Sequence, residues 1–303
     1  MPSIQNPLGA LPARFRRQRL LIIGCGDVGV RVAAIVRRHT HVFALTSSAE
    51  RIETLRQMGV TPLLGNLDQA HSLARLAGLA TRILHLAPPA AQGRVDARTR
   101  HLLASLARRA APASLVYGST SGVYGNCDGQ QISEVQPVNA QTERGRRRVD
   151  AEAQVRFFGR TLNTSVCVLR IPGIYAPNRE GGTPRARLEK QLPVLAAAED
   201  VYTNHIHADD LARACHLALW RGAPQRVYHV NDDTALKMGD YFDVAADHYG
   251  LPRPPRVSRE LATTLLPPSM LSFMSESRRL VNQRMKEELG LRLRYPTVHS
   301  GLR

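Results

Sequence analysis

The chain has 303 residues, and its hydrophobic content of 43% is typical of a globular protein that is large enough to bury a sizeable core. Its formal net charge is +16, but the basic residues are dispersed and lack the interleaved aromatic side chains that stack on bases, so we expect no nucleic-acid partner. No apolar run is long enough to span a bilayer, and residues 1–19 lack the apolar core of a signal peptide, so we expect a cytoplasmic protein without a membrane partner.

The first predicted element is an apolar strand, Leu20–Ile23, that runs directly into the segment Gly-Cys-Gly-Asp-Val-Gly and then into a predicted helix. This G-x-G-x-x-G spacing binds the pyrophosphate of a dinucleotide: the first glycine allows a tight turn, the second lets the phosphates approach, and the third lets the helix pack closely. The helix N-terminus then offers free N–H groups to the anion. A glycine-rich turn without a ligand is the alternative, and the strand–turn–helix context favours the binding site. The predicted cofactor-binding residues are Gly24, Gly26, Asp27, Val28 and Gly29.

Short strands and helices alternate through the first half of the chain. The predicted strands are His41–Leu45, Thr61–Leu64, Arg82–Leu86 and Ser114–Tyr117. The predicted helices are Val28–Arg38, Ala49–Met58, Ser72–Leu76 and Arg94–Arg109. This alternation predicts an α/β fold with a doubly wound parallel sheet of the Rossmann type. Ligands bind outside the carboxyl ends of such strands, so Ala87 and Pro88, which follow one of them, are predicted to contact the cofactor.

The end of the second strand carries a clue to the cofactor. An acidic residue there would bind the ribose 2′-hydroxyl of NAD. The strand ends instead in Thr46 and Ser47, no carboxylate precedes Glu50, and Arg51 follows. Hydroxyl groups and an arginine suit a 2′-phosphate, so the sequence predicts NADP or NAD as the cofactor and favours NADP.

The second half of the chain is organised differently. It contains a long predicted helix over 141–158, strands over 165–170, 202–207 and 227–230, and a helix over 209–220. The proline-rich remainder predicts a small, mainly helical lobe. The expected domains are an arm (1–17), an NAD(P)-binding Rossmann domain (18–175, with returning segments about 201–230), and a substrate lobe with C-terminal segments (176–303).

Three segments carry a family resemblance. They are Ser-Thr-Ser-Gly-Val-Tyr-Gly at 119–125, Leu-Arg-Ile-Pro-Gly-Ile-Tyr-Ala-Pro at 169–177, and His-Ile-His-Ala-Asp-Asp-Leu-Ala at 205–212. With these segments in this order, the chain resembles the short-chain dehydrogenase/reductase superfamily over about residues 18–302. Within it, the resemblance is to the extended branch of NAD-dependent epimerases and dehydratases. The resemblance places Thr120 at the catalytic serine/threonine position, where the alternative is a hydroxyl that satisfies the loop backbone. It also assigns Pro172 to the cofactor site and Asp68 to the adenine, with capping of the next helix as the alternative for Asp68.

The chain departs from this family at the catalytic helix. The family pattern is Y-x-x-x-K, whereas this chain has Arg144 and Arg148 at the two positions. A guanidinium stays protonated and cannot exchange a proton with a substrate. The arginines could hold anions instead, Arg148 at the nicotinamide ribose and Arg144 at a substrate carboxylate or phosphate. The alternative is a solvated basic helix face.

Another proton donor is therefore needed, and the candidates are Tyr124, Tyr175 or a water held by Thr120. Tyrosines of this kind are otherwise packing residues with one satisfied hydroxyl.

His205 and His207 alternate on one predicted strand and, with Asp209 nearby, imitate a metal site. Further ligand spacing is missing, so we predict no metal and a helix start at Asp209 or Asp210.

The sequence thus predicts an atypical NAD(P)-binding oxidoreductase or epimerase/dehydratase-like enzyme. Its substrate would be a small polar or nucleotide-linked molecule, and it would act as a homodimer or monomer. The first alternative is a non-catalytic NAD(P) sensor or regulatory protein that kept the fold and lost the dyad. The second is an arginine-rich protein with a nucleic-acid partner.

Overall fold

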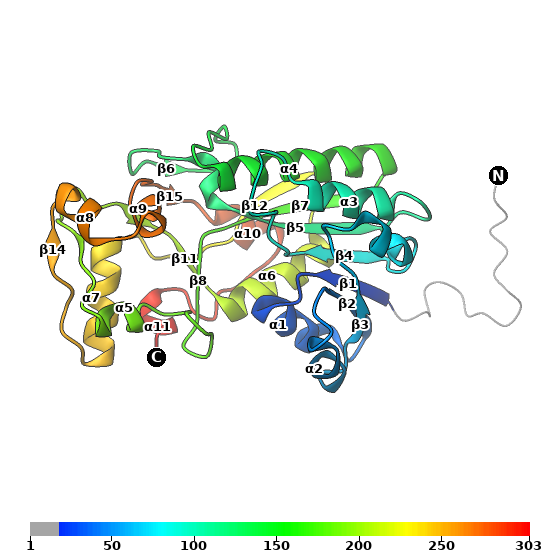
Figure 1. Ribbon diagram of the computed structural model, residues 1–303, viewed down its shortest axis with the longest axis horizontal. Helices are drawn as coiled ribbons and strands as arrows, with labels where there is room; N and C mark the ends of the chain where they lie inside the picture. The colour runs from blue at the N-terminus through cyan, green and yellow to red at the C-terminus, as the bar shows by residue number, and fades with distance from the viewer. Residues whose placement is uncertain (1–17) are drawn as a thin grey trace, which may run out of the picture.

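The computed structural model describes residues 18–303 (Figure 1). The predicted N-terminal arm lies outside the described residues. Within the described range, no helix combines the length and the apolar character that a membrane span requires.

Seven parallel strands form the central sheet, which confirms the predicted doubly wound fold. The strands are β1 (Gln18–Ile23), β2 (Thr40–Thr46), β3 (Thr61–Leu64), β4 (Arg82–His85), β5 (Ser114–Thr120), β7 (Ser165–Ile171) and β12 (Arg226–His229). Their spatial order is β12-β7-β5-β4-β1-β2-β3. The order reverses between β1 and β4, so the carboxyl ends of these two strands flank the crevice where such sheets bind ligands.

Helices cover both faces of this sheet (Figure 1). Leu20 and Ile22 of β1 belong to the core on the side of α1 (Asp27–Val36) and α6 (Ala208–Arg221). The alternate residues Leu21 and Ile23 belong to the core on the side of α3 (97–106) and α4 (143–162). A strand buried on both faces has to be apolar throughout, which is why β1 is a continuous apolar run after its first two residues.

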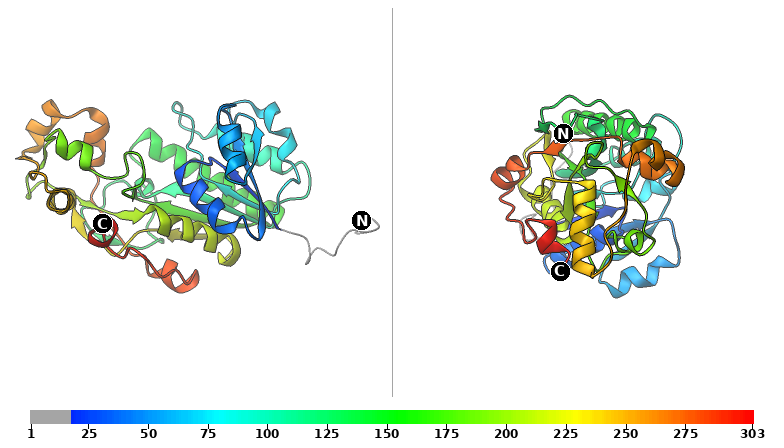
Figure 2. Two further views of the ribbon diagram at one scale, coloured as in Figure 1. Left: turned by 90° about the horizontal axis from the view of Figure 1, so that it is seen from below. Right: turned by 90° about the vertical axis from the view of Figure 1, so that its left-hand side faces the viewer.

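A second, smaller core lies at one end of the molecule, away from β1–β3 (Figures 1 and 2). Its helices are α5 (Arg185–Glu189), α7 (Met238–Tyr249), α8 (Arg259–Leu265), α9 (Pro268–Phe273) and α11 (Val298–Gly301). By contrast, α10 (Gln283–Glu288) packs against β12, and Met285 and Leu289 join the core of the central sheet. The division of the chain at residue 176 stays a prediction.

Other element bounds also differ from the predictions. The predicted helix Ser72–Leu76 is a 3₁₀ helix, η2 (Ala70–Leu76), whereas Ala49–Met58 shortens to α2 (Arg51–Gln57). A second 3₁₀ helix, η3 (Ser121–Tyr124), follows β5 directly.

The strand predicted over 202–207 is wrong as a single element. It is two strands, β10 (Tyr202–Thr203) and β11 (His205–His207); β10 pairs with β13 (Leu236–Lys237), and β11 with β8 (Gly173–Tyr175). Asn204 lies between them, and its side chain donates to the carbonyl of Arg278 and accepts from the N–H of Leu280. The two halves thus differ in their strand partners, which no pattern within the segment indicates.

Candidate cofactor and active site

The glycine loop has the geometry that a dinucleotide site requires. Gly24 has φ +85°, and a Cβ there would lie 2.4 Å from the backbone nitrogen of Ala87, so only glycine fits. At Gly26 an added Cβ would meet no described atom within 4 Å. Gly26 is also the N-cap of α1, and no side chain caps this helix. The loop therefore presents an open, uncapped helix N-terminus beside the end of β4, as an anion site requires.

The end of β2 lies against this loop. Arg51, at the start of α2, donates from Nη2 to the carbonyl of Cys25 at 2.6 Å. The buried Thr46 hydroxyl exchanges hydrogen bonds with the backbone of Ser48, and Ser47 is exposed. The contact to Cys25 uses one of the five N–H donors of the guanidinium, so Arg51 keeps donors for an anion at the strand end.

Asp68 has a partner that the sequence did not suggest. Its carboxylate binds Arg98 through two contacts of 2.7 and 2.6 Å, and Arg98 also reaches the carbonyl of Pro88 at 3.4 Å. The ion pair with Arg98 lowers the pKa of Asp68. The helix-capping alternative is wrong, because Gln69 is the N-cap of η2 and no side chain caps it. Arg98 thus joins the loops that follow β3 and β4.

The arginines at the start of α4 diverge rather than form one solvated face. Arg148 donates from Nη1 to the Tyr117 hydroxyl at 2.9 Å and to the Gly118 carbonyl at 2.7 Å. Its Nε atom is buried, and no hydrogen-bond partner for it occurs among residues 18–303. Arg147 is buried and donates to the carbonyl of Gly93, whereas Arg146 pairs with Glu143 at the surface. Arg148 is therefore the member of this run that is directed at the end of β5.

Tyr124 lies in a buried polar network. Tyr124 is 1% exposed, and its hydroxyl contacts His229 Nε2 and accepts from Arg170 Nη1 at 2.6 Å. Arg170 in turn binds both carboxylate oxygens of Glu152, which also accepts from Ser119. Burial raises the pKa of Tyr124 to about 12, so the hydroxyl is a poor acid in this position.

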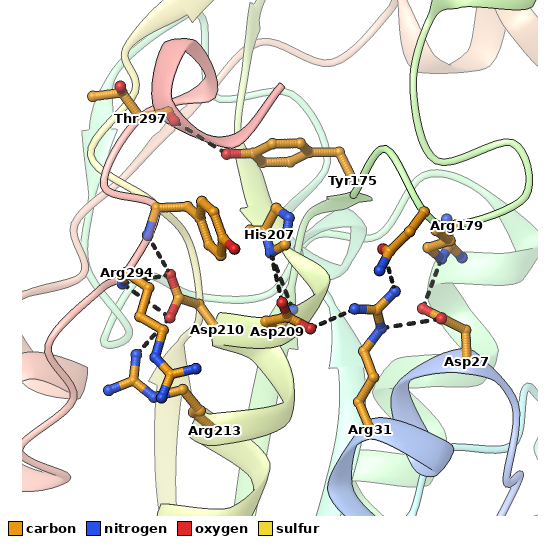
Figure 3. Close-up of polar contacts among 12 residues, drawn as sticks. Asp27, Arg31, Tyr175, Arg179, His207, Asp209, Asp210, Arg213, Arg294 and Thr297 are labelled. Atoms are coloured by element: carbon orange, nitrogen blue, oxygen red, sulfur yellow. Dashed lines mark hydrogen bonds and ion pairs between the residues drawn. The ribbon is translucent and has the colours of Figure 1, made fainter. Parts of the chain in front are cut away.

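Tyr175 is likewise packed away from solvent. It is 2% exposed and donates to Asp232 and to the carbonyl of Thr297, both at 3.3 Å. Burial, with Asp232 as the next contribution, raises the pKa of Tyr175. Both His205 and His207 contact its ring edge-on (Figure 3 shows His207). These contacts match the packing alternative for Tyr175.

The two histidines serve the local fold. His207 Nδ1 accepts from the N–H of Asp209 at 3.2 Å, so His207 is the N-cap of α6, which begins at Ala208, one residue before the earlier of the two predicted starts. The Asp210 carboxylate accepts instead from the backbone of Arg294 and Tyr295, which fastens the C-terminal segment to α6 (Figure 3). No group of three or more potential metal ligands occurs among residues 18–303.

Thr120 lies at the junction of the two lobes. Its hydroxyl accepts from the N–H of Gly122 at 3.2 Å, which matches the loop-satisfying alternative and leaves its own proton free to donate. A Cβ on Gly122 would lie 3.9 Å from a Glu276 carboxylate oxygen, so Glu276 reaches this junction from the smaller lobe. Arg278 binds Glu276 at 2.8 Å and the Gly125 carbonyl at 2.7 Å.

Sequence reasoning missed Glu276 and Arg278. The Arg144 guanidinium lies 6.0 Å from the ring centre of Phe273, in the same segment as Glu276. Burial and the neighbouring Arg148 and Arg147 lower the pKa of Arg144, and the Glu276 carboxylate opposes this lowering. The only signal in the sequence is the polar run at 275–279, and nothing local places it over the end of β5.

The chain matches one known protein family and several solved structures. The profile of the NAD dependent epimerase/dehydratase family matches residues 27–231, a range that begins just after Gly24 and Gly26. A solved structure of a functionally unknown conserved protein from Silicibacter pomeroyi is 30% identical, covering 94% of this chain and 96% of that one, with a TM-score of 0.77.

Two further relatives are enzymes by description. UDP-glucose 4-epimerase from Thermotoga maritima, solved with UDP-glucose, has a TM-score of 0.78 at 17% identity, over 94% of this chain and 96% of that one. A 3-diazoavenalumate denitrifying reductase from a Streptomyces species is 28% identical over 158 residues, 51% of this chain and 51% of that protein. The chain thus spans about half the length of this curated relative.

Proposed function

The chain belongs to the NAD-dependent epimerase/dehydratase family, and from this premise we propose that it binds NADP or NAD and acts as an oxidoreductase or epimerase-like enzyme without a tyrosine–lysine pair. Its substrate would be a small polar or nucleotide-linked molecule that enters between the two lobes. The sugar nucleotide bound by the Thermotoga maritima epimerase supports the nucleotide-linked alternative. A homodimer or monomer remains our prediction for its assembly.

The glycine loop is the observation that carries this proposal. A close approach at Gly24, open space at Gly26 and an uncapped α1 are the features that a bound pyrophosphate needs. The buried, unpartnered Nε of Arg148 supports a role for this arginine at the nicotinamide ribose. A bound nicotinamide supplies the hydride acceptor or donor, and the residues of this chain hold it and orient the substrate.

The preference for NADP rests on the end of β2. Arg51 is anchored on the glycine loop and keeps further N–H donors, and the exposed Ser47 directly follows the end of β2. A 2′-phosphate would find a cation and a hydroxyl here, and no carboxylate precedes Glu50 to bind the 2′-hydroxyl of NAD.

For proton transfer we propose a water held by Thr120. The Tyr124 and Tyr175 hydroxyls are both engaged in buried contacts, so either would have to leave its partners to serve as a donor. The Thr120 hydroxyl keeps a donor at the lobe junction, and Arg144 supplies a fixed positive charge that can stabilise a developing oxyanion. The proposed catalytic set is therefore Thr120, Arg144 and Arg148.

Calorimetric titration with NAD, NADH, NADP and NADPH tests the cofactor site. We expect binding by the native protein and its loss in Gly26→Val, because a branched side chain would fill the open space. Ala198→Val, an exposed position in the smaller lobe, serves as the matched control. A folded Gly26→Val protein with unchanged affinity would contradict the proposed site.

A metabolite panel with each cofactor tests whether the protein is an enzyme. Turnover of bound cofactor supports the oxidoreductase, whereas binding without any turnover favours the sensor alternative. Epimerisation of UDP-glucose at ordinary enzymatic rates would contradict a mechanism without the dyad if it depended on another tyrosine–lysine pair. The double variant Arg144→Tyr/Arg148→Lys then tests whether the scaffold regains the usual chemistry.

A further inference from the structure

The first turn of α1 carries a negative charge at the proposed anion site. Asp27 is the first residue of this helix, directly after Gly26. A carboxylate there interacts favourably with the helix dipole, but it repels the two phosphate charges that the same helix end would bind. The proposed function therefore requires that the charge of Asp27 be neutralised.

Arg31 alone cannot neutralise it, because Arg31 serves two carboxylates. Its Nε atom binds Asp27 at 3.1 Å, while its Nη1 atom binds Asp209 at the start of α6 (Figure 3). Its Nη2 atom donates to Asn178 at 2.7 Å. One guanidinium between two aspartates leaves a surplus of one negative charge among Asp27, Arg31 and Asp209.

Arg179 supplies the missing positive charge. Its Nε atom lies 3.3 Å from the second oxygen of Asp27 (Figure 3). Its Nη1 atom donates to the Ile174 carbonyl at 3.3 Å. The turn that carries it is closed by a hydrogen bond from the N–H of Ala176 to the carbonyl of Gly182. A Cβ on Gly182 would lie 2.6 Å from the Ala176 carbonyl oxygen, so glycine permits this tight turn.

We propose that Arg179 is a cofactor-positioning residue, whose charge balances Asp27 so that the dinucleotide pyrophosphate meets a neutral rather than a negative helix N-terminus. The cluster comprises Asp27, Arg31, Asp209 and Arg179, two charges of each sign. It also fastens the 176–182 turn to α1 and α6. This inference rests on the proposed dinucleotide site and assigns to it a residue from a turn about 150 positions further along the chain.

The test compares a single variant with a double variant. Calorimetry at low salt measures their affinities for NAD and ADP-ribose. Arg179→Gln keeps the aliphatic stem and a polar end group but removes the charge, which leaves Asp27 unbalanced, so we expect both ligands to bind about fivefold to tenfold more weakly. Adding Asp27→Asn removes the surplus charge, so the double variant should bind within about twofold of the native protein. The loss in Arg179→Gln should shrink as salt is added, because the cluster is partly exposed.

Arg253→Gln is the matched control, because Arg253 also pairs with an aspartate, Asp247, and lies in the smaller lobe. It should leave both affinities unchanged, and circular dichroism verifies the fold of every variant. Native affinity in Arg179→Gln overturns the proposal. So does a double variant that binds as weakly as Arg179→Gln, since Arg179 would then act by holding the turn and not by its charge. If the native protein binds neither NAD, NADP nor ADP-ribose, the proposed function itself fails.

Discussion

The two ends of the proposed cleft, at β1 and at β5, are built on different principles. At β1 the site consists of backbone: a turn that only glycine can form, an open position and an uncapped helix. At β5 it consists of charged side chains, with Arg148 on the strand carbonyl and the Glu152–Arg170 pair behind it. In our proposal Arg144 and Arg148 stand at the second end, at the positions where the family resemblance implies a tyrosine and a lysine. The backbone geometry of the glycine loop tolerates few other residues, whereas different side chains can form a site at the end of β5.

The largest expected effect lies behind the β5 end. Glu152→Ala leaves Arg170 as an unpaired cation that is 4% exposed, and we expect a loss of about 3–5 kcal/mol in the free energy of unfolding. Urea denaturation measures this loss. Asp247→Ala, which breaks a surface pair, should change stability little. Equal, small losses in both variants would show that the β5 end does not depend on its buried charges.

The second prediction concerns cofactor choice at the β1 end. Arg51→Ala should reduce the preference for NADP over NAD by about 1–3 kcal/mol, because it removes a charged partner of the 2′-phosphate. Calorimetry of both cofactors measures the ratio, with Arg56→Ala on the same helix as the control. The interpretation is wrong if the native protein binds NAD as tightly as NADP.

The third prediction links the two ends. Arg148→Ala should weaken dinucleotide binding by about tenfold, and Arg148→Lys should weaken it less, since lysine keeps the charge but not the planar donor set. Arg146 lies on the same helix but pairs with Glu143 at the surface, so Arg146→Ala should leave dinucleotide affinity unchanged. Native affinity in Arg148→Ala would restrict cofactor binding to the β1 end.

The last two predictions concern the dependence of stability on pH, first at the buried histidines of β4 and β12. Burial lowers the pKa of His85 and of His229 to about 3, with Arg148 adding to the effect on His85 and Arg170 to that on His229. Below about pH 6.5 the unfolded chain binds protons at these residues that the native protein does not, so stability should fall as the pH drops from 6.5 to 4. Thermal melts of native protein, His85→Asn and the exposed control His248→Asn measure this fall, which should be smaller only in His85→Asn.

Asp232 opposes this trend. Burial raises its pKa to about 7, so the native protein binds a proton there that the unfolded chain releases above about pH 4. Its contribution to stability is present at low pH and is lost as the pH rises through about 7. Asp232→Asn should therefore steepen the fall between pH 6.5 and 4, and an unchanged slope would contradict this assignment.

The sequence by itself determined the parts of the protein that depend on local order. Alternating apolar strands and helices specify a doubly wound sheet, because a strand buried on both faces has to be apolar and each crossover needs a helix. The glycine loop was predictable for the same reason, since Gly24 has to adopt a positive φ within a few residues of β1.

Only the tertiary structure decided which side chains meet. Asn204, between β10 and β11, binds residues 278–280, and Glu276 approaches Gly122, two residues after Thr120, from the other lobe. Arg179 reaches Asp27 in the same way, across about 150 residues of chain. Tyr124 and Tyr175 turned out to donate or accept within buried networks, which their positions in family-like motifs could not reveal. Such pairings depend on how separate lobes pack, and no periodicity within a segment encodes the distance between two side chains on different elements.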